Sequence, residues 1–230
     1  MENKMLNIDP KYKVLDGFTL KMIAIITMLI DHVGHVIFPE IAILRIIGRF
    51  SFPIFCFLLV EGFFHTSNVK KYMFRLFGAA IISEIPYNLC MMGRVWYQKE
   101  QNVMFTLFLG LVLIYLFEQF ESRLYRIVFF ILICLITYIL NPDYSVFGIF
   151  MIFAFYYLKS NDIYKIAVIA IMNFYAVWWG HQAYATLALI PIYLYNGKRG
   201  MGGKGVQYFF YIFYPLHMVI IFFIKKNFFM

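Results

Sequence analysis

The chain has 230 residues, of which 63% are hydrophobic, 21% aromatic and only 14% charged. A soluble domain is about half apolar and about a quarter charged, so this composition excludes an ordinary soluble globular protein and predicts an integral membrane protein. The formal net charge of +8 would suit nucleic-acid binding. The basic residues follow the loops and form no common face, however, so we expect no nucleic-acid partner.

Apolar segments occupy nearly the whole chain. A helix that crosses the bilayer needs about 20 apolar residues, within a range of about 17–25. We therefore predict an all-α, polytopic membrane bundle of about nine transmembrane helices. A single membrane domain covers 1–230, with 1–17 as the N-terminal segment and 18–224 as the bundle. The predicted spans are 18–38, 41–64, 73–92, 103–119, 125–140, 145–159, 163–179, 182–195 and 206–224. The fifth to eighth of them are short enough to include a re-entrant pair.

The placement of Lys and Arg predicts the orientation of the chain. Loops that stay in the cytoplasm carry an excess of these residues. When the N-terminus is placed inside, most of the 20 Lys and Arg residues fall on the inner side. We therefore expect a multi-pass protein of the cell membrane with a cytoplasmic N-terminus and, for nine spans, an outer C-terminus.

Five ionisable side chains within the predicted spans need an explanation, because a charge at mid-membrane costs about 2.5–3.5 kcal/mol on insertion scales. They are Asp31, His32, Arg49, Glu84 and His217. Their similar depth on four different spans predicts one internal polar cavity. A proline lies within four residues of the last three. Each proline frees a backbone carbonyl that needs a buried or wet partner, as cavity walls provide.

Helical geometry assigns partners to these groups. His32 directly follows Asp31 and therefore points about 100° away from it around the helix, so the two are not expected to form a direct dyad. We expect Asp31 to pair with Arg49 across helices, and His32 to pair with Glu84 or His217. A pair that only holds the bundle together is the structural alternative for Asp31 and Arg49.

Six motifs along the chain point to a family. They are, in order, LDGFTLKMIAIITMLIDHVGH, GRFSFPIFCFLLVEGFFHTSNVKKYMFRLF, SEIPYN, NVMFTLFLGL, DYSVFGIFMI and FYPLH. Together, from about residue 15 to 220, they resemble the TraX-like family, which is named for the conjugal-transfer pilin acetylase. LDGF and FPIF…EGFF more distantly resemble membrane acyltransferases that use acetyl-CoA. The resemblance implies transfer of an acetyl group from cytoplasmic acetyl-CoA to an acceptor at the membrane.

Acetyl transfer from a thioester needs a base for the acceptor and donors for the oxyanion that develops on the carbonyl. His32 is the expected base, because a histidine titrates near neutral pH. Asp31 would tune the site electrostatically, and Arg49 is either the oxyanion stabiliser or the partner of Asp31. Glu84 and His217 are further candidates for proton handling. The acceptor stays open: a peptide N-terminus, a glycan or another amine or hydroxyl compound.

Coenzyme A carries several phosphate charges, so its site should be basic and should face the cytoplasm. The glycine-rich loop NGKRGMGGKG at 196–205 could hold phosphates through its amides and cations, although a positive-inside linker explains the same loop. The three cysteines lie inside apolar runs without metal-ligand spacing, so no metal is expected. The expected cofactor-binding residues are Lys70, Lys71, Arg75, Lys198, Arg199 and Lys204, with Glu61, Asn102 and Thr106 from the family motifs.

A proton-coupled small-solute transporter or channel is the alternative function. Carboxylates and histidines in broken helices also form proton relays. Against this alternative, the two halves of the chain show no convincing internal repeat. The intramembrane polar residues also concentrate in the first three spans and the last one.

Overall fold

A computed structural model describes residues 10–176 and 180–229. Within these ranges the chain is all-helical, and its only β-type pairing consists of two isolated bridges. The predicted all-α fold is therefore confirmed. The helices are α1 (Gly17–Val36), α2 (Ala42–Gly48), α3 (Ser51–His65), α4 (Val69–Met92), α5 (Val103–Gln119), α6 (Arg123–Leu140), α7 (Ser145–Tyr157), α8 (Asp162–Tyr175), α9 (Leu189–Tyr193) and α10 (Lys204–Phe228), with the 3₁₀ helices η1 (Pro10–Tyr12) and η3 (His181–Ala188).

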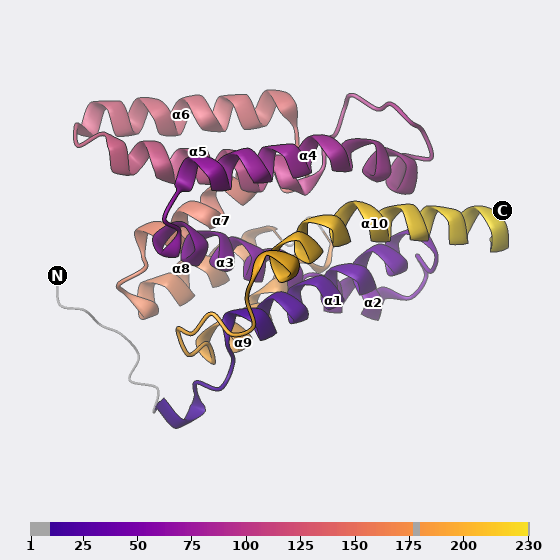
Figure 1. The fold of residues 1–230 in the computed structure, drawn as a ribbon, viewed down its shortest axis with the longest axis horizontal. Coiled ribbons are helices and arrows are strands. Elements are labelled where there is room, and N and C mark those ends of the chain that lie inside the picture. Colours follow the sequence, from indigo (N-terminus) through magenta and orange to yellow (C-terminus); the bar gives the residue numbers. More distant parts are fainter. Residues whose placement is uncertain (1–9, 177–179, 230) are drawn as a thin grey trace.

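The long helices lie lengthwise in one bundle (Figure 1). Helix α1 packs against α2, α3 and α10, and α4 packs against α10 and α5. The starts of α1, α4 and α10 lie at one end of the bundle, which we name the basic end for its lysines and arginines. The loop between α4 and α5, helix α2 and the C-terminus lie at the opposite end. This arrangement brings the first and last long helices side by side.

The number of spans is lower than predicted. Four helical segments in the described residues are long and apolar enough to cross a membrane, namely Gly17–Val36, Ala42–His65, Arg123–Leu140 and Lys204–Phe228. Helices α5 and α7 are apolar but shorter, with 17 and 13 residues. Helix α4 has 24 residues, but it carries several charged side chains. The apolar helices identify a membrane protein. The predicted number of nine spans was too high by the criteria of helix length and charge, because several of the predicted spans are too short or too charged.

The prediction that residues 182–195 form a transmembrane α-helix was wrong. It consists of an eight-residue 3₁₀ helix, η3, followed by the five-residue α9. Pro191 lies within α9 and has no N–H to give to the carbonyl four residues earlier, which limits α-helix formation there. The preceding predicted span, 163–179, corresponds to α8, which ends at Tyr175; residues 177–179 lie outside the described ranges.

The predicted span 41–64 is divided into α2 and α3 at Arg49 and Phe50. The N–H of Arg49 lies within hydrogen-bond distance of the carbonyls of Arg45 and Ile46, at 3.2 and 3.3 Å, so the helix tightens here. Pro53 lacks the N–H that would bond to the Arg49 carbonyl, which explains the break. The break turns this segment so that its arginines face α1.

Candidate functional site

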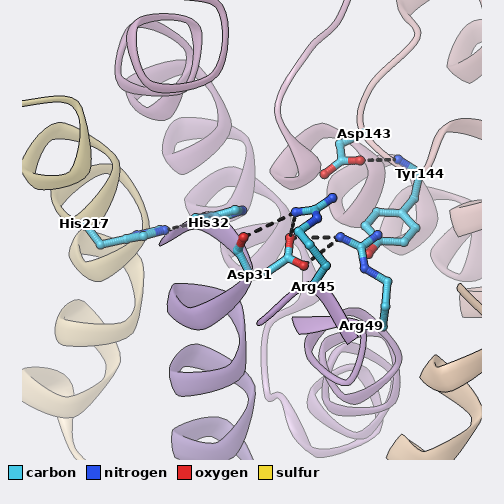
Figure 2. Close-up of polar contacts among 7 residues, drawn as sticks. All are labelled: Asp31, His32, Arg45, Arg49, Asp143, Tyr144 and His217. Carbon is cyan, nitrogen blue, oxygen red and sulfur yellow. Dashed lines mark hydrogen bonds and ion pairs between the residues drawn. The ribbon is translucent and has the colours of Figure 1, made fainter. Parts of the chain in front are cut away.

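Asp31 on α1 forms ion pairs with two arginines of the next segment (Figure 2). Its Oδ2 accepts a hydrogen bond from Arg45 Nη1 at 2.6 Å, and its Oδ1 accepts one from Arg49 Nη2 at 2.8 Å. The side chains of Asp31 and Arg49 are only 11% and 14% exposed. The expected Asp31–Arg49 pair is therefore present. Arg45, which the sequence analysis did not place in the site, joins it.

The close approach of α1 and α2 makes this contact possible. Arg45 and Arg49 are four residues apart, so both reach the same face of the segment. Gly48 lies directly against Asp31, and a Cβ atom at this glycine would collide with the Asp31 carboxylate. The absence of a side chain at Gly48 therefore lets the carboxylate reach both guanidinium groups.

His32 and His217 form a hydrogen-bonded pair between α1 and α10. His32 Nδ1 lies 2.7 Å from His217 Nε2, and the two rings are nearly parallel, with an interplanar angle of 9° and centroids 5.0 Å apart. These values place the rings edge to edge, as a hydrogen bond between ring nitrogens requires. Both residues are buried. Of the two partners proposed for His32, the structure shows His217.

A backbone carbonyl determines how protons are arranged in the neutral pair. His217 Nδ1 lies 2.8 Å from the carbonyl oxygen of Phe213, which can only accept a hydrogen bond. His217 Nδ1 therefore carries the proton, and its Nε2 accepts from His32 Nδ1–H. The remaining nitrogen, His32 Nε2, is then unprotonated. Figure 2 shows this nitrogen on the ring edge away from His217, toward the arginine pair.

Glu84 does not join this group. Its Oε2 accepts hydrogen bonds from the Asn102 side chain at 2.6 Å and the Asn102 backbone at 3.3 Å, and its Oε1 accepts one from Asn88 at 3.4 Å. Asn102 in turn caps the start of α5 by accepting from Met104 N. Glu84 therefore fastens α4 to α5, and the predicted grouping with His32 is not observed. Similar depth in the membrane did not reveal that Glu84 faces a different neighbour.

A cavity of about 40 Å³ lies beside His32 and Arg49, which is room for about one water molecule. Asp143 and Tyr144, from the turn before α7, also line it. Neither was selected from the sequence, although both belong to the motif DYSVFGIFMI. Their inclusion depends on how the turn folds back onto α3 and α5. The full lining is Met28, Asp31, His32, Gly48, Arg49, Ser51, Phe52, Phe55, Val103, Asp143 and Tyr144.

The turn that carries these residues has an unusual backbone. Asn141, Tyr144 and Ser145 have φ angles of 47°, 63° and 38°. Such left-handed conformations cost non-glycine residues on the order of 1–3 kcal/mol each and are typical of functional sites. The Tyr144 ring stacks on Phe52 with centroids 3.6 Å apart, and the Arg49 guanidinium lies 5.9 Å from the same ring. Packing in the cavity wall therefore maintains the strained turn.

At the basic end, three of the expected cofactor residues lie together. Lys70, Lys71 and Arg75 line an open groove at the start of α4. When the Gln207 amide is oriented with its oxygen toward Arg75, this oxygen accepts hydrogen bonds from Arg75 Nε at 3.1 Å and from Nη2 at 3.2 Å. Arg75 therefore also faces the first turns of α10.

The loop before α10 is fastened to the start of α1 at this same end. Gly17 N donates to the Lys198 carbonyl at 2.8 Å, and Asn196 N donates to the Leu15 carbonyl at 2.8 Å. Asp16 caps α1 by accepting from Thr19, and these hydrogen bonds lower the pKa of Asp16. The fastening explains how Lys198 and Arg199 come to lie near the start of α1, whereas Lys204 begins α10.

Within the described residues, the other three expected cofactor residues make no hydrogen bond or ion pair with the six basic ones. Glu61 pairs with Lys159 at 4.0 Å and with His65 at 3.8 Å. Asn102 contacts Glu84 and the Ala80 carbonyl, and Thr106 donates to the Asp143 carbonyl at the opposite end. Because a helix rises about 1.5 Å per residue, Lys71 and Glu84 on α4 are about 20 Å apart. Asn102 and Thr106 therefore lie at the opposite end of the bundle from the basic groups, and their role in cofactor binding stays a prediction.

Comparison with known proteins identifies the family. The family model described as TraX protein matches residues 16–225. The probable fimbrial assembly protein FimC, serogroup H1, of Dichelobacter nodosus is 30% identical over 231 residues, which cover 89% of this chain and 93% of that protein. An uncharacterized protein of Rickettsia prowazekii is 31% identical over 100 residues, or 44% of this chain and 37% of that protein. No solved structure matches. The matched range includes every residue that lines the cavity, and the chain belongs to the TraX protein family.

Proposed function

We propose that this protein is a multi-pass acetyltransferase of the cell membrane, which moves the acetyl group of cytoplasmic acetyl-CoA to an amine or hydroxyl acceptor. The observation that carries the proposal is the His32–His217 hydrogen bond, which leaves an unprotonated imidazole nitrogen beside a buried guanidinium. Membership of the family and the similarity to a probable fimbrial assembly protein support it. The basic end faces the cytoplasm in this proposal, in keeping with the distribution of Lys and Arg.

His32 acts as the general base. Its Nε2 takes the proton of the acceptor N–H or O–H as that atom attacks the acetyl carbon. The new bond forms between the acceptor atom and the carbonyl carbon, and the carbon–sulfur bond breaks. The thiolate of coenzyme A leaves and receives the proton from His32. His217 holds the His32 ring in the required tautomer and stabilises the imidazolium that forms for a moment.

Arg49 stabilises the oxyanion. Its Nη2 is occupied by Asp31, but its Nε and Nη1 have no hydrogen-bond partner among the described residues. Arg45 likewise uses only Nη1. A guanidinium has five N–H donors in a rigid plane, so donors remain for a developing negative charge while Asp31 fixes the orientation. In a cavity this small, such preorganised donors act with little screening by water.

The donor reaches the cavity along α1. Lys21 precedes His32 by eleven residues, which is close to three helical turns, so both lie on one face of α1 about 16 Å apart. Lys21 Nζ lies over the Phe210 ring of α10, 5.6 Å from its centroid. One face of α1 thus runs from Lys21 near the basic end to His32 at the cavity. Phosphates held by Arg75 and the loop before α10 would direct the thioester along this face.

The test uses purified protein in nanodiscs with radiolabelled acetyl-CoA. We expect saturable binding and a labelled product, and His32→Ala should abolish transfer while acetyl-CoA still binds. His35→Ala is the matched control, because His35 lies one turn further along the same helix and is exposed. Absence of acetyl-CoA binding by the wild type, together with solute flux in proteoliposomes, would refute the proposal and favour a transporter.

A further inference from the structure

Asp143 lies where the cavity meets the surface. It lines the cavity together with His32 and Arg49, and yet the residue as a whole is exposed. Figure 2 shows its carboxylate beside the arginine pair, on the side of the turn before α7. A molecule that enters the cavity from this side would pass Asp143 first.

The backbone of Asp143 is fixed on both sides. Its N–H donates to the Gln101 carbonyl at 2.8 Å, and its carbonyl accepts from the buried Thr106 hydroxyl. Gly148, one turn into α7, allows the close approach, because a Cβ there would collide with the side chains of Thr106 and Phe52. The position of the carboxylate is therefore determined by α5 and α3 rather than by a free loop.

The side chain of Asp143 is held at one oxygen only. Oδ1 accepts from Tyr144 N at 2.9 Å, whereas Oδ2 has no hydrogen bond or ion pair within the described part of the chain. Asp31, in contrast, has both oxygens engaged by arginines. An ionised carboxylate can only accept hydrogen bonds, so a ligand at Oδ2 must be a donor, and a charged donor makes the stronger bond.

We propose that Asp143 is a specificity-determining residue that binds the protonated amine of the acceptor, so that the site prefers amines over alcohols. This inference rests on the proposed acetyl transfer. The ammonium loses one proton to solvent at the exposed mouth and a second to His32 Nε2 as the carbon–nitrogen bond forms. The second proton then goes to the thiolate of coenzyme A. The products are the N-acetyl amine, coenzyme A and one released proton.

The test compares two matched acceptors, n-butylamine and n-butanol, with radiolabelled acetyl-CoA and protein in nanodiscs. The wild type should acetylate the amine more efficiently. Asp143→Asn keeps the shape and the Tyr144 contact but removes the charge, so KM for the amine should rise about tenfold or more. KM for acetyl-CoA should stay unchanged, and kcat/KM should fall much more for the amine than for the alcohol, whose turnover also shows that the variant folds.

A binding measurement makes the test independent of turnover. Butylammonium should raise the thermal midpoint of the wild type but not of D143N, and butanol should affect neither protein. The inference is overturned if the amine protects both proteins equally or neither, or if D143N loses both acceptors to the same extent. Failure of the wild type to bind acetyl-CoA would instead refute acetyl transfer itself, and the specificity role with it.

Discussion

His32 Nδ1 and His217 Nε2 lie 2.7 Å apart, although 185 positions separate the two residues in the chain. Their hydrogen bond connects the first and last long helices of the bundle. The Phe213 carbonyl fixes the proton at one end of this pair, and the unprotonated nitrogen therefore lies at the other end, in the cavity. The two histidines form a single hydrogen-bonded unit in which one ring orients the other.

His217→Ala tests this unit. The change removes the acceptor for His32 Nδ1–H and leaves a buried donor unpaired, so the His32 ring loses its defined tautomer. We expect kcat to fall about 100-fold while KM for acetyl-CoA is unchanged. Steady-state kinetics in nanodiscs measure both. His217→Gln, whose amide oxygen can accept the same hydrogen bond, should recover part of the rate. A wild-type kcat in H217A would show that His217 does not orient His32.

Because Asp31 and Arg49 form a buried ion pair, we expect substitutions of the two residues to have strongly non-additive effects on the stability of the protein. Removing one partner of a buried pair leaves an uncompensated charge and typically costs about 3–5 kcal/mol. Asp31→Asn and Arg49→Gln should therefore each lower the thermal midpoint, and the double variant should lose less than the sum of the two. Arg45→Gln should have a smaller effect, since its side chain is 27% exposed. Thermal unfolding of the wild type, D31N, R49Q and the double variant in nanodiscs measures the coupling. Additive effects of the single changes would mean that the pair contributes no coupling energy.

Gly48 and Gly78 provide a matched comparison for the approach of α2 to α1. A Cβ at Gly48 would collide with the Asp31 carboxylate, whereas a Cβ at Gly78 has no neighbour within 4 Å. Gly48→Ala should displace Asp31 from its arginines and reduce both the thermal midpoint and the transfer rate. Gly78→Ala should be neutral or stabilising by about 0.5–1 kcal/mol, because alanine favours a helix. Equal behaviour of the two variants would show that the close approach is not required.

The sequence predicted the pairs best where two quantities sufficed, namely the energetic cost of a charge in the membrane and the depth of the residue in its span. A charge in a membrane span requires a partner, and few partners were available at the depth of Asp31 and His32. Depth does not specify which face of a helix meets which neighbour, however, and so Glu84 was assigned to the wrong group. Its side chain meets Asn102 at the start of α5.

Other features depend on backbone conformation and could not be predicted. Tyr144 has a positive φ, which a tyrosine rarely adopts, and no local pattern indicates that packing on Phe52 will stabilise it. The apolar run 182–195 has the composition of a short helix, and composition does not distinguish a 3₁₀ helix from an α-helix. The functional assignment of Asp143 therefore needed the tertiary structure.

Arg75 separates binding of the donor from the chemistry. Its guanidinium faces Gln207 on α10 and lies in the groove with Lys70 and Lys71, whereas Arg94 is exposed at the opposite end. Arg75→Gln should raise KM for acetyl-CoA about tenfold and weaken its dependence on salt, because one charge-assisted contact to a phosphate is lost. The value of kcat should be unchanged, since the cavity is distant. Arg94→Gln removes the same charge and should change neither constant. If the two variants alter KM equally, the effect is one of net charge, and the basic end is not the donor site.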